Sequence, residues 1–225
     1  MQHYIGYIII NRARRVAGAI ILLLFVCSML HAEDDSYARV LEENTKPFMA
    51  LRTNALYDAL IVPNIGVEVW LPMNFTLGFD WFGTWIKSDK RHLFWQGYGG
   101  YFTARYYFGR VAEECPMTGH YVGIYGSMLT YDIAFGGTGY QAAKPGFGGG
   151  VEYGYSLPLQ YNLCFDFTIG VGYQGGEYKV YRPTNDGTGH YEWLSTRMRN
   201  WWGPTKAEVT LKWLIAPIQK KGGNR

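Results

Sequence analysis

The sequence predicts an all-β fold: an antiparallel, eight-stranded transmembrane β-barrel of the outer-membrane type, after an N-terminal signal peptide. The first observation is composition, because the 225 residues include 19 Tyr, 12 Phe, 8 Trp and 29 Gly, and only 17% are charged. Aromatic residues favour strands, and glycine in a strand marks a close backbone approach. The second observation is a period-two alternation of apolar and polar residues. The third is an alternation of short and long connections.

The first 32 residues have the features of a secretory signal peptide. Three arginines precede an apolar run over residues 16–26, and we expect cleavage after Ala32. An uncleaved anchor helix is the alternative, but this run is shorter than the roughly 20 apolar residues that cross a bilayer. The expected organisation is a signal peptide (1–32), a polar periplasmic linker (33–47), the barrel (48–215) and a polar C-terminal tail (216–225).

Eight segments carry the alternation. Within residues 205–215, for example, Leu211 and Trp213 point to one face, whereas Glu208 and Lys212 point to the other. The four clearest segments are 75–86, 147–157, 162–173 and 205–215. Four further segments fit less cleanly: 48–58, 63–71, 94–108 and 119–132. Most are about 9–13 residues long, which is the length of a tilted membrane-spanning strand.

The connections between these segments differ between the two ends of the barrel. If residue 48 enters from the periplasm, the near-side turns are 72–74, 109–118 and 158–161. The far-side loops are then 59–62, 87–93, 133–146 and 174–204. Short periplasmic turns and longer outer loops are typical of outer-membrane barrels. We therefore expect a location in the outer membrane of a Gram-negative bacterium, with outer-membrane lipid around the barrel.

A soluble secreted β-sandwich or a lipocalin-like barrel is the main alternative fold. It would alternate too, but with its apolar face turned inward. The polar face here is also small, since it contains Gly148, Gly150, Gly154, Gly170 and Gly172. Eight strands enclose little space, so a small polar face suits the lumen and leaves the apolar face for lipid.

Several strings in the sequence resemble a known family. They are TNALYDAL (53–60), PNIGVE (63–68), KSDKRH (87–92), LTYD (129–132) with FGG (135–137), EYGYSLP (152–158) and GPTKAE (203–208). Together they resemble a family of small exported proteins of anaerobic gut Gram-negative bacteria, catalogued as a domain of unknown function. The resemblance spans roughly residues 46–216. It implies an outer-membrane barrel and implies no activity.

By the alternation, nine ionisable residues point into the lumen. They are Arg52, Glu68, Asp80, Arg105, Glu152, Asp166, Lys206, Glu208 and Lys212. Charges packed into a narrow lumen must pair, because an isolated buried charge costs several kcal/mol. The structural interpretation is a salt-bridged plug, and the functional one is a polar pore or a gated channel. The small interior of an eight-stranded barrel favours the plug.

A lipid-modifying outer-membrane enzyme is an alternative of a different class, but we expect no enzyme. Such an enzyme needs a nucleophile beside a base. No Gly-x-Ser-x-Gly elbow is present, and a solvated polar loop explains the one near pair, Ser88 and His92, better than a dyad does. The glycine runs lack the Lys-Ser/Thr ending of a phosphate-binding loop.

Neither cofactor nor metal is expected. Cys115 and Cys164 remain after the signal peptide, with no spacing to histidine that suggests zinc, and whether they pair stays open. The whole chain carries 21 Lys and Arg against 18 Asp and Glu, and the signal peptide contains three of the cations and no anion. The mature chain is therefore formally neutral, which argues against a nucleic-acid partner.

The expected far-side loop 174–204 is rich in aromatic residues and arginines. The candidate binding residues are Tyr178, Tyr181, Arg182, Tyr191, Trp193, Arg197, Arg199, Trp201 and Trp202. Aromatic and arginine side chains are enriched in binding hot spots. We therefore expect a structural, adhesive or assembly-related binding role through the outer loops, with a cell-surface protein or a glycan as partner. The alternative is that Trp201 and Trp202 are interfacial anchors above the last strand.

Overall fold

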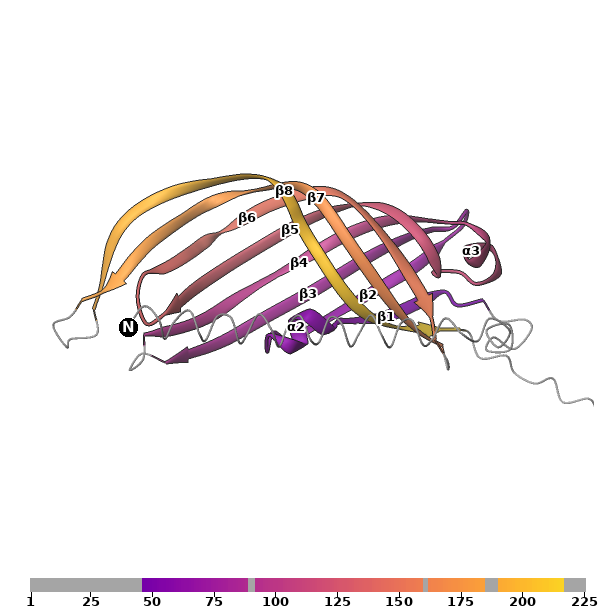
Figure 1. Cartoon of the computed structure of the whole chain (residues 1–225), viewed down its shortest axis with the longest axis horizontal. Helices are drawn as coiled ribbons and strands as arrows, with labels where there is room; N and C mark the ends of the chain where they lie inside the picture. The colour runs from indigo at the N-terminus through magenta and orange to yellow at the C-terminus, as the bar shows by residue number, and fades with distance from the viewer. Residues whose placement is uncertain (1–45, 89–91, 160–161, 185–189, 217–225) are drawn as a thin grey trace, which may run out of the picture. The chain divides into compact units, whose positions relative to one another are not determined.

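The computed structural model describes residues 46–88, 92–159, 162–184 and 190–216, which form one closed antiparallel barrel (Figure 1). Each strand pairs with the next along the chain, and β8 pairs with β1. The strands are β1 (Met49–Asn54), β2 (Asn64–Leu71), β3 (Phe75–Ser88), β4 (Leu93–Phe108), β5 (Gly119–Phe135), β6 (Gly139–Pro158), β7 (Leu163–Pro183) and β8 (Tyr191–Ile215). The all-β, eight-stranded antiparallel part of the prediction is confirmed.

The described residues also form two short helices, α2 (Ala55–Ala59) and α3 (Arg110–Glu114). Among the described residues, no helix is long and apolar enough to cross a membrane. The expected signal peptide, nearly all of the expected linker and the expected tail after Ala216 lie outside the described residues.

The first strand is shorter than the predicted segment 48–58. It ends at Asn54, whose side chain accepts a hydrogen bond from the backbone N–H of Leu56 at 3.0 Å and so caps α2. Asparagine is a strong N-cap because its side-chain oxygen satisfies an otherwise unpaired N–H group at the start of a helix. The prediction that the strand continues to residue 58 is therefore wrong.

The predicted far-side loops 133–146 and 174–204 are also wrong, because most of their residues belong to strands. β7 continues to Pro183, and β8 begins at Tyr191. The two strands stay paired from Leu163–Trp213 to Pro183–Tyr191. In this part of β8 nearly every residue is exposed or half-buried, so no single apolar face exists. Backbone pairing holds the strands here, and hydropathy alternation could not reveal it.

The barrel wall has unequal height around the ring. β1 pairs with β8 only from Met49–Ile215 to Asn54–Thr210, whereas β8 runs on to Tyr191. We call the end that carries α3 the near end, and the opposite end the far end. Residues 129–135, 139–146, 174–183 and 191–205 of β5 to β8 lie toward the far end and form what we call the far-side extension (Figure 1).

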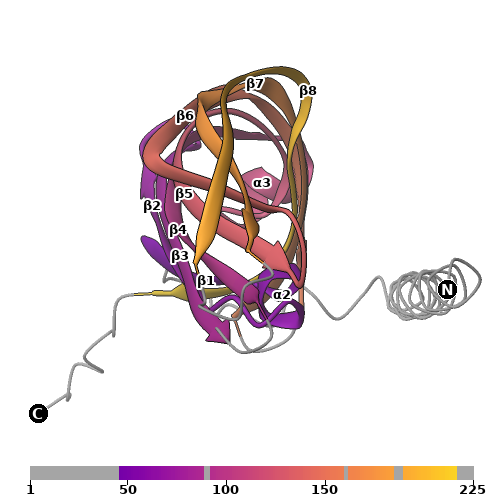
Figure 2. The same ribbon diagram turned by 90° about the vertical axis from the view of Figure 1, so that its left-hand side faces the viewer.

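The connection between β4 and β5 fills the near end of the ring. Met117 and Thr118 follow α3 and are completely buried, and the Lys212 ammonium donates to the Met117 carbonyl oxygen at 2.7 Å. Seen along the ring from the far end, α3 lies behind the strands (Figure 2). The surrounding apolar cluster consists of Ala50, Tyr107, Ala112, Met117, Tyr121, Cys164 and Leu214. The near end is therefore packed with side chains.

The barrel is polar inside and apolar outside. On β8, Lys206 and Lys212 are buried, whereas Trp213 on the alternate face is 55% exposed. Inward glycines make room for large side chains, because a β-carbon on Gly154 would overlap the ring of Tyr121. Long charged and aromatic side chains therefore fill the lumen, and inward glycines on neighbouring strands leave the space that they occupy.

Candidate functional site

The structure places all nine predicted lumen residues inside the ring. β1 to β4 each contribute one of them, β6 and β7 each contribute one, and β8 contributes three. Eight are buried, and the side chain of Asp80 is 19% exposed. They are Arg52, Glu68, Asp80, Arg105, Glu152, Asp166, Lys206, Glu208 and Lys212.

Arg105 lies at the centre of this ion network. Its Nε atom lies 2.6 Å from Glu152 Oε1. Its Nη1 atom lies 3.4 Å from Glu68 Oε2 and 3.6 Å from Asp166 Oδ2. Its guanidinium carbon lies 4.6 Å from the centroid of the Tyr121 ring, which is within the range of a cation–π contact. One cation therefore joins carboxylates from three strands.

The other three cations extend the network in three directions. Arg52 contacts Glu68 at 3.0 Å and also pairs with Asp80. Lys212 lies 3.1 Å from Asp166. Lys206 lies 2.7 Å from Glu152 and 3.4 Å from Glu208. These pairs connect all nine residues into one continuous network that crosses the ring.

Neutral donors add hydrogen bonds to the fully buried carboxylate of Glu68. Thr76 donates to Glu68 at 2.7 Å and Tyr107 donates to it at 2.8 Å. Taking an ion out of water costs several kcal/mol, which well-placed partners and additional hydrogen bonds offset. Four cations and five carboxylates leave a formal charge of 4 − 5 = −1 in the network. The arrangement suits a filled plug, because its charged groups contact one another.

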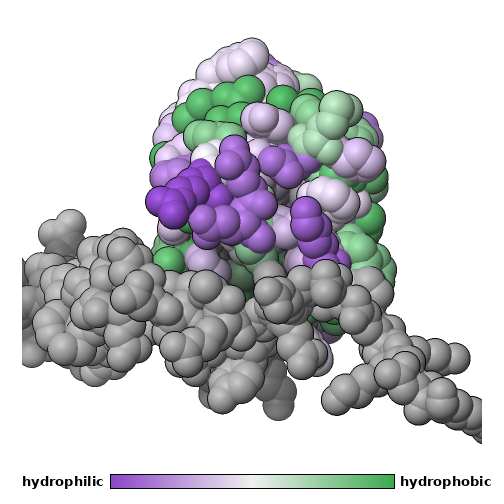
Figure 3. Space-filling view, turned by 90° about the vertical axis from the view of Figure 1, so that its right-hand side faces the viewer, coloured by the Kyte–Doolittle hydropathy of each residue, from purple (hydrophilic) through white to green (hydrophobic). Residues whose placement is uncertain are grey.

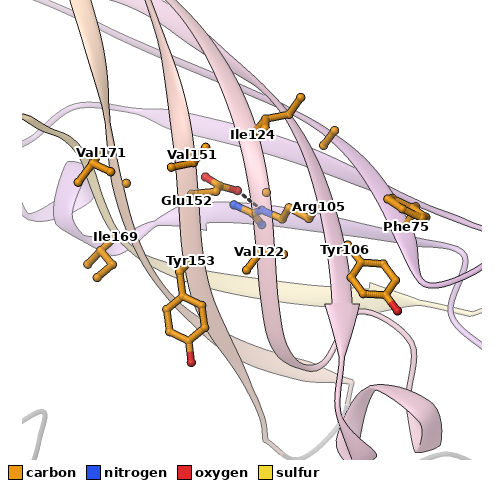
Figure 4. A pocket seen from close by; sticks show the side chains of 13 residues that line it. Phe75, Arg105, Tyr106, Val122, Ile124, Val151, Glu152, Tyr153, Ile169 and Val171 are labelled. Atoms are coloured by element: carbon orange, nitrogen blue, oxygen red, sulfur yellow. Dashed lines mark hydrogen bonds and ion pairs between the residues drawn. The ribbon is translucent and has the colours of Figure 1, made fainter. Parts of the chain in front are cut away.

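The outer wall beside this network forms a shallow apolar groove of about 660 Å³ over β3 to β7. Figure 4 shows the Arg105–Glu152 ion pair between the strands, while Val122, Ile124 and Ile169 extend from the wall. The exposed surface of this groove is almost entirely apolar.

Two of the three described histidines, His92 and His120, contact tyrosines. His92 Nδ1 lies 3.2 Å from the Tyr191 hydroxyl, and His120 Nδ1 lies 2.8 Å from the Tyr153 hydroxyl. In the part of the chain that the structure describes, no hydrogen bond joins Ser88 to His92. The same residues contain no group of three or more His, Cys, Asp and Glu that could hold a metal ion.

The predicted outer-loop residues lie on the far-side extension, on strands and not on a loop. β7 carries Tyr178, Tyr181 and Arg182, and β8 carries Tyr191, Trp193, Arg197, Arg199, Trp201 and Trp202. The prediction of a loop is therefore wrong for all nine. Strand pairing separates neighbouring side chains onto opposite faces, so these residues cannot form one continuous patch.

The structure brings only some of these residues together. The rings of Tyr181 and Tyr191 are 5.4 Å apart, and Tyr191 lies 5.6 Å from Phe94 of β4. This contact ties the β7–β8 hairpin to β4. Trp193 and Trp202 are 64% and 75% exposed. Arg182 and Arg197 are also exposed.

A cavity of about 460 Å³ lies on the inner side of the far-side extension. It is lined by Tyr101, Leu129, Gln174, Arg199, Asn200, Trp201, Pro204 and Thr205. Sequence reasoning found Arg199 and Trp201 but missed the other six. A glycine and a proline inside the aromatic run, Gly203-Pro204, were the available signal, because such residues mark bulges that redirect a strand.

The comparisons with known proteins agree with the resemblance seen in the sequence. The family described as "protein of unknown function (DUF3575)" matches residues 19–215. No curated protein and no solved structure matches the chain. A match over this much of the chain establishes membership: the chain belongs to the DUF3575 family of proteins of unknown function.

Proposed function

We propose that this protein is a sealed outer-membrane β-barrel that acts as a structural, adhesive or assembly-related binding protein through its far-side extension. The observation that carries the proposal is the reversed arrangement of the barrel, with nine charges inside and apolar side chains outside. Outer-membrane barrels have this arrangement, because lipid surrounds their outer face.

The apolar outer surface supports a lipid environment. Phe102 is 69% exposed, Ile169 is 66% exposed and Ile124 is 62% exposed. A soluble protein rarely exposes apolar side chains over so continuous a surface. Seen from the near end, hydrophilic residues gather on the described surface, with hydrophobic residues around them (Figure 3). A lipocalin-like barrel would need the opposite arrangement, with an apolar interior.

The filled lumen favours binding over conduction. The ion network spans the ring, and the buried residues Met117 and Tyr107 fill its near end. A pore would need a continuous water-filled path past these side chains. The far-side extension projects from this sealed part and exposes aromatic and arginine side chains, which are typical of binding surfaces.

The experiment is to express the protein with its own N-terminal segment, isolate the outer membrane and compare boiled with unboiled samples by gel electrophoresis. We expect the protein in this fraction, with a mobility that changes on boiling because a closed barrel resists the detergent until heated. Recovery in the soluble periplasm, with no mobility change, would overturn the proposal. The apolar outer faces would then need another partner.

A further inference from the structure

The cavity of the far-side extension has the size and lining of a small-molecule site. Ligand sites typically measure about 300–1,000 Å³ and combine apolar walls with a few placed polar groups. This one combines Leu129 and Trp201 with the polar side chains of Gln174, Arg199 and Thr205. Its lining contains one cation and no carboxylate. The cavity lining therefore favours an anion, whereas the ion network has a formal charge of 4 − 5 = −1.

Arg199 is the charged group of the cavity. Its Nη2 atom donates to the Tyr131 hydroxyl at 2.8 Å, and its guanidinium carbon lies 5.1 Å and 5.7 Å from the ring centroids of Tyr131 and Tyr178. The two tyrosines hold the side chain in place. Among the residues that the structure describes, no ion pair includes Arg199. A guanidinium presents five N–H donors, so most of its donors remain for a ligand.

Trp201 provides a flat apolar surface beside this cation. Its indole N–H donates to the Pro204 carbonyl oxygen at 3.3 Å, and its ring lies across Gly203, where a β-carbon would come within 3.0 Å of it. The glycine therefore lets the ring lie against the backbone. A ring held in this way loses little conformational freedom when a ligand binds.

A bulge in β8 places these groups around the cavity. Gly170 pairs with Lys206, but Val171 pairs with Pro204, so Thr205 has no partner on β7. Thr205 instead hydrogen-bonds to the Tyr125 hydroxyl in the lumen. Bulges redirect side chains and are common beside functional sites. On one side of this bulge the inward residues of β8 belong to the ion network, and on the other side residues of β8 line the cavity.

We propose that this cavity binds a small organic anion that carries a ring, with its carboxylate, phosphate or sulfate group on Arg199 and its ring on Trp201. The inference rests on the proposed function, because it names the ligand class for the far-side extension. Planar guanidinium groups recognise these anions through paired hydrogen bonds. Gln174 and Thr205 line the same cavity and are held there by hydrogen bonds, Gln174 to Ser127 at 3.0 Å and Thr205 to Tyr125.

The test is isothermal titration of the purified full-length protein in a neutral polyether detergent, with gel mobility checked for every variant. Phenyl phosphate and glucuronate carry both a ring and a charge. Inorganic phosphate carries only the charge, and benzyl alcohol and methyl glucoside carry only a ring. We expect the first two probes to bind more tightly than the other three.

Matched variants separate the two parts of the site. Arg199→Gln should weaken phenyl phosphate and glucuronate about 10- to 100-fold, the ratio expected for loss of hydrogen bonds to a charged group. Arg110→Gln, in α3 at the near end, should leave binding unchanged. Trp201→Ala should reduce both affinities toward that of inorganic phosphate. Trp202→Ala should not, because Trp202 packs on Tyr173 at 5.1 Å on the other face.

Several outcomes would overturn the inference. They are wild-type affinity in Arg199→Gln, equal binding of charged and uncharged probes, and no binding of any probe to a barrel whose mobility changes on boiling. This last outcome would leave the proposed function intact, because it concerns only the cavity. Conversely, specific binding by a protein recovered from the soluble periplasm would overturn the proposed location and keep the ligand class.

Discussion

Replacing the central arginine of the ion network with alanine should strongly destabilise the barrel. Arg105→Ala removes the cation that contacts Glu68, Glu152 and Asp166. Removing one partner of a buried ion pair typically costs about 3–5 kcal/mol, because it leaves an uncompensated buried charge. Each of the three carboxylates keeps one other cation within 3.1 Å. We therefore expect the lower end of this range, about 3 kcal/mol.

The measurement is urea unfolding of the refolded protein in detergent micelles, followed by tryptophan fluorescence and by the fraction that migrates as the compact form. Arg110→Ala is the matched control, because its pair with Glu114 has side chains that are 91% and 66% exposed. Exposed pairs contribute about 0–1 kcal/mol, so its midpoint should remain close to that of the wild type. Adding Glu152→Gln to Arg105→Ala should recover part of the loss, because it removes one negative charge from a network in which five carboxylates then face three cations.

Two results would refute this reasoning. The first is an Arg105→Ala midpoint equal to that of Arg110→Ala, which would mean that the network contributes nothing to stability. The second is a large conductance of Arg105→Ala in planar bilayers. Since Lys206, Lys212 and the buried tyrosines remain in place, the plug interpretation predicts no conductance from this variant. A large increase would favour the gated-pore interpretation of the same residues.

Three further predictions follow from the wall, the outer face and the near end. Gly154→Val should lower the yield of refolded barrel because it overlaps Tyr121, whereas Gly126→Val, where a β-carbon has no neighbour within 4 Å, should refold normally. Ile169→Lys should destabilise the protein in lipid vesicles by about 2–4 kcal/mol if this face contacts lipid, whereas the control Ile169→Val should not. Wild-type stability of Ile169→Lys would contradict the lipid assignment. Burial raises the pKa of the Cys115 thiol. In a variant that keeps only this cysteine, the folded protein should therefore need a higher pH than the urea-unfolded protein to react with a thiol reagent. Identical pH profiles of the two states would contradict this.

The interior of the closed part of the barrel could be predicted because a strict physical rule applies there. Each strand separates a polar lumen from an apolar outer face, so alternate residues must differ in polarity. This rule places Lys206, Glu208 and Lys212 together on β8. It also predicts an ion network, because charges in so narrow a space must pair. The particular partners could not be predicted, since they depend on the stagger between strands.

The far-side extension could not be predicted because the same rule does not hold there. Its β8 segment has water-accessible residues on both faces, so nothing requires alternation. Gly203 also has a positive φ of 151°, and the unpaired Thr205 shifts the period by one residue. A prediction that identifies strands by one buried apolar face therefore assigns residues 174–204 to a loop.

Two residues that break the alternation, Phe82 and Thr205, lie beside or in the lining of the far-side cavity, and this connects the failures of prediction to the proposed binding site. Phe82 is an exception within residues 75–86, and it packs inside the ring against Tyr101, with centroids 6.0 Å apart. Tyr101 lines the far-side cavity, as does the bulged Thr205. Local rules are expected to fail at functional sites, because there a sequence satisfies a second requirement besides folding. The strictly alternating part of the chain therefore accounts for the filled interior of the barrel. Residues that depart from the pattern lie around the cavity, whose one arginine forms no ion pair with any residue that the structure describes.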